Sequence, residues 1–191
     1  LDERKFVRFE FMPGEKEELG RMAADWEGGT FEDLTNAQIS DYEWQLMDAS
    51  VMTKGISKLS TMNHAPDYDE MVKVGYRHYI DLCKEKIAAI DDYNIENMGQ
   101  KYTWEVMIIV MEAIIAFAHR YADLAEKMAS ECTSPERKEQ LLTMAETCRI
   151  VPENPPQTFQ QAVQLVFFTH LALMMENNGS DHSLGRFDQY M

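Results

Sequence analysis

The stretch that decides the fold is VPENPPQTFQQAVQLVFFTHL, residues 151–171. It joins a proline-rich linker, 151–156, to an apolar segment with helical spacing. Each proline fixes its own φ and restricts the residue before it, so the linker is rigid and ends any helix before it. Thr158 then caps a helix predicted over Phe159–Asn177, with apolar side chains on both sides. A helix of this kind is normally buried in a large protein.

A second apolar segment, Val106–Ala118, lies inside a helix predicted from Asn94 to about Ser130. It is interrupted by Glu112 and is shorter than the roughly 20 residues of a membrane span, so no span is predicted. Two such helices exceed what 191 residues bury easily. Part of their surface is therefore expected to meet protein outside this chain.

The remaining periodic segments also indicate helices, and no strand or repeat is evident, so the predicted fold class is all-α. Gly75 falls inside one of these segments and is interpreted as a small residue that allows close packing. Lys54–Pro66 is predicted to be a loop. The remaining predicted helices are Glu15–Trp26, Asn36–Thr53, Asp67–Ile90 and Pro135–Cys148.

Composition excludes several classes of protein. The net charge is −15, which disfavours a nucleic-acid surface built from clustered basic residues. The N-terminal sequence lacks the apolar core of a signal peptide. Three widely spaced cysteines fit neither a zinc motif nor a disulfide framework, and a reducing cytoplasm is the expected location. Because Leu1 is not an initiator methionine and Met191 interrupts a pattern, we expect the chain to be truncated at both ends.

The residues alone offer no self-contained active site, since glycine-rich phosphate loops, HExxH and CxxC motifs are absent from the sequence. Glu112 is expected to be a buried hydrogen-bonding carboxylate in preference to an acid–base catalyst, with Arg120 as a structural partner. His170 is expected to be a satisfied core histidine. Buried, inert thiols are expected at Cys83, Cys132 and Cys148.

His64 has a different setting, because it lies in the predicted loop just before a helix. Loops carry functional residues disproportionately, and histidine exchanges protons near neutral pH. On these grounds a functional role and a structural one are equally open for His64.

Five blocks of sequence, taken in order, resemble one enzyme family. They are GTFEDL (29–34), HAPDYDEMVKVG (64–75), EAIIAFAHRYADLAEKMA (112–129), AETCRIVPENPPQTFQQAVQLVFFTHL (145–171) and ENNGSDHSLGRFDQYM (176–191). The chain resembles the glycyl radical enzymes of the pyruvate formate-lyase superfamily over nearly its whole length. It is more similar to their dehydratase and carbon–heteroatom lyase branch. VPENPPQTFQQAVQ and GRFDQYM are the most specific blocks.

The resemblance implies that residues 1–191 form part of a single domain, the helical shell portion of a ten-stranded α/β barrel. A radical-SAM activating enzyme would install a glycyl radical in a C-terminal loop. That radical would convert a central cysteine to a thiyl, which abstracts a substrate hydrogen. Both motifs belong downstream of this segment, so no catalytic residue, bound cofactor or metal is expected within it. A homodimer is expected for the full-length protein.

The resemblance also implies substrate-binding residues. His64, followed by Asp67-Tyr68, matches a loop that commonly lends a histidine to the substrate pocket, although Asn63 replaces the usual preceding glycine. Ser180 and Asp181 stand where the dehydratases keep a His-Ser pair, with His182 one residue further along. An aspartate there suits a hydroxyl, an amine or a cationic head group.

The expected function is therefore that of a segment of an anaerobic glycyl radical dehydratase or lyase acting on a small polar substrate. The segment would contribute pocket wall and barrel-covering helices and would be inactive alone. One alternative is a non-catalytic acidic helical interaction module derived from the family. Another, within the family, is formate acetyltransferase-like activity.

Overall fold

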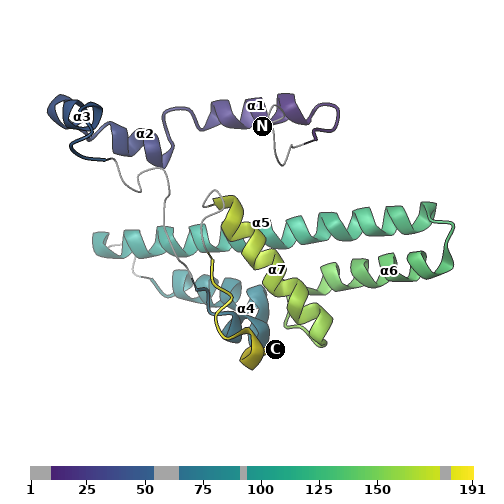
Figure 1. The fold of residues 1–191 in the computed structure, drawn as a ribbon. Coiled ribbons are helices and arrows are strands. Elements are labelled where there is room, and N and C mark those ends of the chain that lie inside the picture. The colour runs from purple at the N-terminus through teal and green to yellow at the C-terminus, as the bar shows by residue number, and fades with distance from the viewer. Residues whose placement is uncertain (1–9, 54–64, 91–93, 177–181) are drawn as a thin grey trace. The chain divides into compact units, whose positions relative to one another are not determined.

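The computed structural model describes residues 10–53, 65–90, 94–176 and 182–191, and these are helical with no extended strand. The predicted all-α class is confirmed for this part of the chain (Figure 1). The chain divides into two compact units, Leu1–Thr61 and Met62–Met191. The helices are α1 (Glu15–Asp25), α2 (Phe31–Asn36), α3 (Asp41–Asp48), α4 (Tyr68–Ala88), α5 (Ile95–Glu131), α6 (Pro135–Ile150), α7 (Phe159–Glu176) and α8 (Phe187–Tyr190).

The first unit contains α1, α2 and α3, none of which has a buried residue. The predicted helix Asn36–Thr53 is wrong at both ends, because α3 begins only at Asp41 and already ends at Asp48. Two separate N-caps divide the region around its start. Thr30 accepts a hydrogen bond from the backbone N–H of Asp33 at 3.1 Å. Ser40 accepts one from the N–H of Glu43 at 3.3 Å. Each acidic side chain bonds back to its cap, and this hydrogen bond lowers the pKa of both carboxyls.

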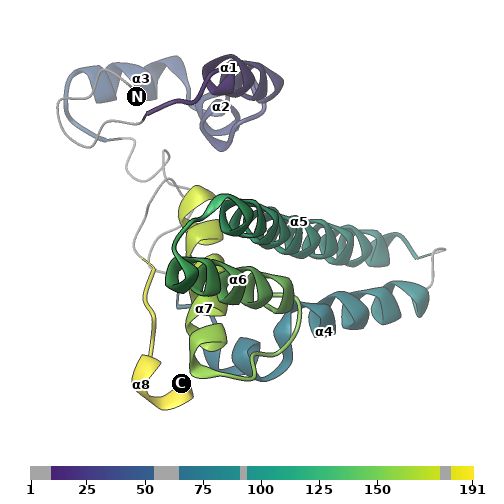
Figure 2. The ribbon, with the colours of Figure 1, turned by 90° about the vertical axis from the view of Figure 1, so that its right-hand side faces the viewer.

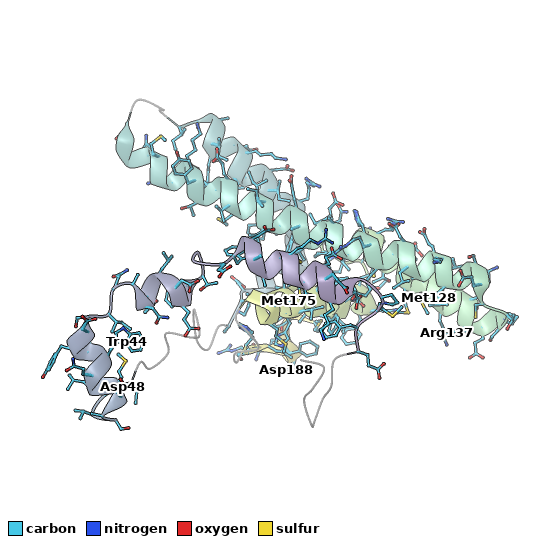
Figure 3. The ribbon with its side chains drawn as sticks, turned by 90° about the horizontal axis from the view of Figure 1, so that it is seen from above. Trp44, Asp48, Met128, Arg137, Met175 and Asp188 are labelled. Atoms are coloured by element: carbon cyan, nitrogen blue, oxygen red, sulfur yellow. The ribbon has the colours of Figure 1, made fainter. Side chains whose placement is uncertain are left out.

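The largest element of the second unit is the antiparallel hairpin of α5 and α6 (Figures 1 and 2). Met128 on α5 and Arg137 on α6 lie at its closed end (Figure 3). Ser134 caps α6 by accepting from the N–H of Arg137 at 3.4 Å, with Pro135 at the first helical position. A line of small side chains lets the two helices approach closely, and the buried residues of this line are Ala118, Ala122, Ala125 and Ala129 on α5 with Ala145 on α6.

Helix α4 bends at Gly75, where φ is 70° and ψ is 173°. The predicted uninterrupted helix Asp67–Ile90 is therefore wrong at this position, and α4 consists of two helical segments. The close packing predicted for Gly75 is confirmed. A β-carbon there would lie 2.6 Å from the carbonyl carbon of Asn154 and 2.8 Å from the Glu153 oxygen. Only glycine adopts this backbone conformation readily.

The segment that meets Gly75 is the proline-rich linker 151–156, and we call this contact the linker clamp. The backbone N–H of Tyr76 donates to the Pro152 carbonyl, and that of Arg77 donates to the Glu153 carbonyl, both at 2.9 Å. These N–H groups begin the second segment of α4 and have no partner within it. The Arg77 guanidinium also bonds Glu153 Oε1 at 2.5 Å. The linker thus caps a helix far away in the sequence.

Helix α7 contacts α4, α5 and α6 (Figure 2). Its inner face is buried through Leu165, Val166 and Phe168. Its outer face is not covered, since Phe159 is 66% exposed and Phe167 56%. Ile109 on α5 is similarly open at 64%. Both apolar helices therefore carry exposed apolar surface in the described part of the second unit, and the expectation that this surface meets protein outside the chain stays a prediction.

Candidate functional site

The candidate site lies where α4, α7 and the final residues 182–191 come together. The side chains of Tyr76 and Thr169 form its inner wall, and a buried hydrogen bond of 2.7 Å joins Tyr76 Oη to Thr169 Oγ1. Thr169 also donates to the Leu165 carbonyl at 3.0 Å, which makes Tyr76 the donor of the first bond. Burial raises the pKa of Tyr76, so its hydroxyl keeps its proton at neutral pH. This bond fixes the second segment of α4 against the middle of α7.

Two histidines meet beside this wall. The ring of His170, on α7, lies 5.8 Å from the ring of His182, nearly perpendicular to it. Both rings are partly buried. Nδ1 of His170 has no hydrogen-bond partner within the described ranges, so the predicted satisfied core histidine is wrong. His170 is only partly buried, and its ring packs against that of the predicted site residue His182.

The residues after His182 form a closed turn. Gly185 has φ of 62°, and its N–H donates to Ser183 Oγ at 3.1 Å. Tyr190 Oη donates to the Leu184 carbonyl at 2.6 Å, which ties α8 back to the start of the turn. Figure 3 labels Met175 near the end of α7 and Asp188 on α8. We call residues 182–190 the terminal turn.

The terminal turn rests on the first residue of α4. The ring of Tyr190 stacks on that of Tyr68, with 5.9 Å between centroids. Tyr68 is 1% exposed, and its hydroxyl has no hydrogen-bond partner among the residues that the structure describes. Burial, with smaller contributions from Tyr190 and Tyr76, raises the pKa of Tyr68 to about 12. Its buried hydroxyl is therefore protonated, and not a phenolate, at physiological pH.

An open apolar groove of about 970 Å³ lies beside the Tyr76–Thr169 bond, between α4, α5 and α7. Aliphatic and thioether side chains dominate its walls. Arg120 lies at the groove with its guanidinium over the Phe117 ring, 5.5 Å from the centroid. The groove is continuous with the exposed apolar faces of α5 and α7. Its chemistry suits packing against other protein better than binding a polar molecule.

Of the four predicted substrate-binding residues, only His182 falls within the described ranges. His64, Ser180 and Asp181 lie outside them. The residues that sequence reasoning missed are Tyr68, Tyr76, Thr169 and Tyr190. Tyr76 and Thr169 are 93 positions apart, and no periodic pattern reports such a pairing. Tyr68 and Tyr190 do lie in the two quoted blocks HAPDYDEMVKVG and ENNGSDHSLGRFDQYM, and that membership is the available signal.

Two further predictions are corrected. Glu112 is not buried: its side chain is 50% exposed and pairs with Lys84 at 3.6 Å, so Arg120 is not its partner. The carboxylate points outward because this side of α5 is open. Cys132 is only partly buried, since it lies where α5 ends, and its thiol is 3.6 Å from the Ser134 carbonyl. Cys83 and Cys148 are buried as predicted, and burial raises the pKa of the Cys148 thiol.

Within the described ranges, no group of three or more potential ligands gathers to hold a metal ion. One stretch of α5, Asn97–Glu131, is long and apolar enough to cross a membrane by length and composition alone, a test that core helices also pass. Helices α4 and α6 pack along it, and it carries the Glu112–Lys84 pair. We therefore interpret its open apolar surface as one that other protein covers.

This arrangement can be compared with known proteins. The model of the protein family described as "PFL-like: Pyruvate formate lyase-like" matches residues 1–191 of this chain. The chain belongs to the pyruvate formate lyase-like family. Among curated relatives, the isethionate sulfite-lyase of Nitratidesulfovibrio vulgaris is 36% identical over 179 residues, covering 88% of this chain. The (2S)-3-sulfopropanediol dehydratase of Klebsiella oxytoca is 31% identical over 180 residues, covering 93% of this chain.

Solved structures are similar to this chain over its whole length. The glycerol-bound B12-independent glycerol dehydratase from Clostridium butyricum is similar over 100% of this chain, with a TM-score of 0.83 and 27% identity. A glycyl radical enzyme from Archaeoglobus fulgidus is similar over 100% of it, with a TM-score of 0.76 and 28% identity. The chain spans about 22% of the length of the curated relatives and 24% of these structures.

Proposed function

We propose that this segment is part of an anaerobic glycyl radical enzyme that eliminates a group from, or cleaves, a small polar substrate. The observation that carries the proposal is the similarity over the whole chain, at a TM-score of 0.83, to a glycerol dehydratase solved with glycerol. The two curated relatives above are a carbon–sulfur lyase and a dehydratase by name, so both classes of reaction are represented.

In this proposal the segment builds shell and pocket wall and leaves the radical chemistry to residues outside it. A glycyl radical, installed by a radical-SAM activating enzyme, would supply the unpaired electron that starts each turnover. The exposed apolar faces of α5 and α7 and the groove between them would pack against the barrel. Residues 1–191 would thus belong to one domain, in a cytoplasmic protein that forms a homodimer.

The pocket wall in the proposal comprises His64, Ser180, Asp181 and His182. His182 has structural support, because the His170 ring and the terminal turn hold its position. The Asp181 carboxylate would accept hydrogen bonds from a substrate hydroxyl or amine. His64 would contribute from the loop before α4. Exclusion of water around such a site protects radical intermediates, and the extensive apolar surface of α5 and α7 suits that need.

The proposal is tested with the full-length protein that carries this segment. The protein is incubated anaerobically with its activating enzyme and S-adenosylmethionine, and the glycyl radical is quantified by electron paramagnetic resonance. Isethionate, (2S)-3-sulfopropanediol and glycerol are then offered, with pyruvate and coenzyme A for the formate acetyltransferase alternative. A native product of only about 191 residues that forms no radical would support the interaction module instead.

The pocket wall is tested in the same assay. Asp181→Ala is expected to lower turnover at least tenfold, because a substrate hydrogen bond to a charged group is lost, while the radical signal stays unchanged. The parallel variant His64→Ala separates substrate contact from loop structure by the same two readouts. Unchanged turnover in either variant removes that residue from the pocket wall.

A further inference from the structure

The terminal turn is held at both of its ends by aromatic contacts. At its start, the His182 ring meets the His170 ring of α7 at 5.8 Å. At its end, the Tyr190 ring stacks on Tyr68 of α4 at 5.9 Å. The two supports come from different helices, and α7 and α4 are themselves joined by the buried Tyr76–Thr169 bond. The turn therefore rests on one rigid base.

A hydrogen bond then connects the end of the turn to its start. Tyr190 Oη donates to the Leu184 carbonyl at 2.6 Å, across six residues. Leu184 is two positions from His182, and the next residue, Gly185, has φ of 62°. Arg186 bonds Gln189 through its side chain at 3.3 Å, which closes the turn from within. The position of the Tyr190 ring thus fixes the backbone immediately beyond His182.

We propose that Tyr190 is a positioning residue for the substrate pocket and acts through His182. Its ring is anchored on Tyr68, and its hydroxyl holds the Leu184 carbonyl, so the backbone presents His182 in a single orientation. The inference rests on the proposed function, in which His182 belongs to the pocket wall. Tyr190 itself touches neither substrate nor radical, and its contribution is orientation before binding.

The main test uses the full-length protein with Tyr190→Phe, which keeps the stacked ring and removes the one hydrogen bond. The substrate is whichever of isethionate, (2S)-3-sulfopropanediol and glycerol the wild type converts. KM is expected to rise about fivefold, the effect of one neutral hydrogen bond. The kcat and the radical content stay within twofold of wild type. Tyr42→Phe, at a tyrosine that is 67% exposed on α3, serves as the matched control and leaves KM unchanged.

A double-mutant cycle with His182→Ala distinguishes positioning from general support of the fold. If Tyr190 acts through His182, Tyr190→Phe raises KM in the wild-type background and has no effect in the His182→Ala background. Equal effects in both backgrounds overturn the proposal. Loss of kcat, radical and melting temperature together would also overturn it, because that pattern belongs to a purely structural residue.

A second measurement needs no turnover, so it separates this inference from the proposed function. Amide hydrogen exchange at Gly185 and Arg186 is compared between wild type and Tyr190→Phe. Exchange at these amides is expected to rise about fivefold, while exchange in the α5–α6 hairpin stays constant. Unchanged exchange refutes the positioning role whether or not the enzyme is active. A wild type that forms no radical refutes the proposed function and leaves the exchange result to decide whether Tyr190 orders the turn.

Discussion

Replacing Gly75 with alanine is expected to open the linker clamp. The backbone at φ 70° and ψ 173° lies in a region that is essentially restricted to glycine and costs other residues about 1–3 kcal/mol. The added β-carbon would lie 2.6–2.8 Å from three backbone atoms of residues 153–155, which are not the ends of flexible side chains. Relief of this clash separates the linker from α4.

The separation breaks two backbone hydrogen bonds, those of the Tyr76 and Arg77 amides, each of which contributes about 1 kcal/mol. Together with the strain, the local loss is about 3–5 kcal/mol. Since each 1.4 kcal/mol is a factor of ten, protection of these two amides from hydrogen exchange should fall by about a hundredfold to several thousandfold. Hydrogen-exchange mass spectrometry of the full-length protein measures this directly.

Gly99→Ala is the matched control. Gly99 lies in α5, and nothing outside the backbone of its own helix lies within 4 Å of the position that its β-carbon would take. Alanine there lowers the conformational entropy of the unfolded chain and should stabilise the folded protein by about 0.5–1 kcal/mol. The two glycines should therefore respond in opposite directions. If Gly75→Ala leaves the Tyr76 and Arg77 amides protected and the melting temperature unchanged, the interpretation of the clamp is refuted.

Three other changes test separate contacts. Thr169→Val leaves the buried Tyr76 hydroxyl without its partner and should destabilise the protein by about 1–3 kcal/mol in urea unfolding; no loss would show that the bond is dispensable. Tyr68, with a pKa of about 12, should contribute stability that is complete below pH 10 and is lost as the pH rises from 10 to about 12. Tyr68→Phe should therefore reduce the pH dependence of unfolding across that range, and the dependence that remains belongs to other tyrosines with raised pKa values, such as Tyr76. Iodoacetamide at pH 8 should label the partly exposed Cys132 well before the buried Cys148, and mass spectrometry giving the reverse order would contradict the assigned burial.

The periodicity of apolar residues predicted most helices, because each helix makes its own backbone hydrogen bonds and carries a repeated apolar face. The limits of α5 and α7 were predicted within about two residues for this reason. The bend at Gly75 was not predicted, because apolar residues on both sides keep helical spacing through it. The division between α2 and α3 was missed although Ser40 and Glu43 form a capping box visible in the sequence.

Contacts between distant residues account for what the sequence did not reveal about the site. Glu112 was expected to be buried because its neighbours in sequence are apolar, yet it is exposed, as are Ile109 and Val110, while Ile115 faces the core. Burial depends on what packs against a helix, and the sequence of one helix does not contain that information. The roles of Tyr68 and Tyr190 likewise arise only when α8 meets α4.

The linker clamp also has a consequence for synthesis on the ribosome. The α5–α6 hairpin consists of neighbours in sequence and can form as soon as it emerges. The clamp, in contrast, pairs residues 76 positions apart, and α4 is made first. Until Glu153 leaves the exit tunnel, the second segment of α4 has only water to cap it. The nascent chain should therefore hold its longest helix pair before α4 acquires its final bend.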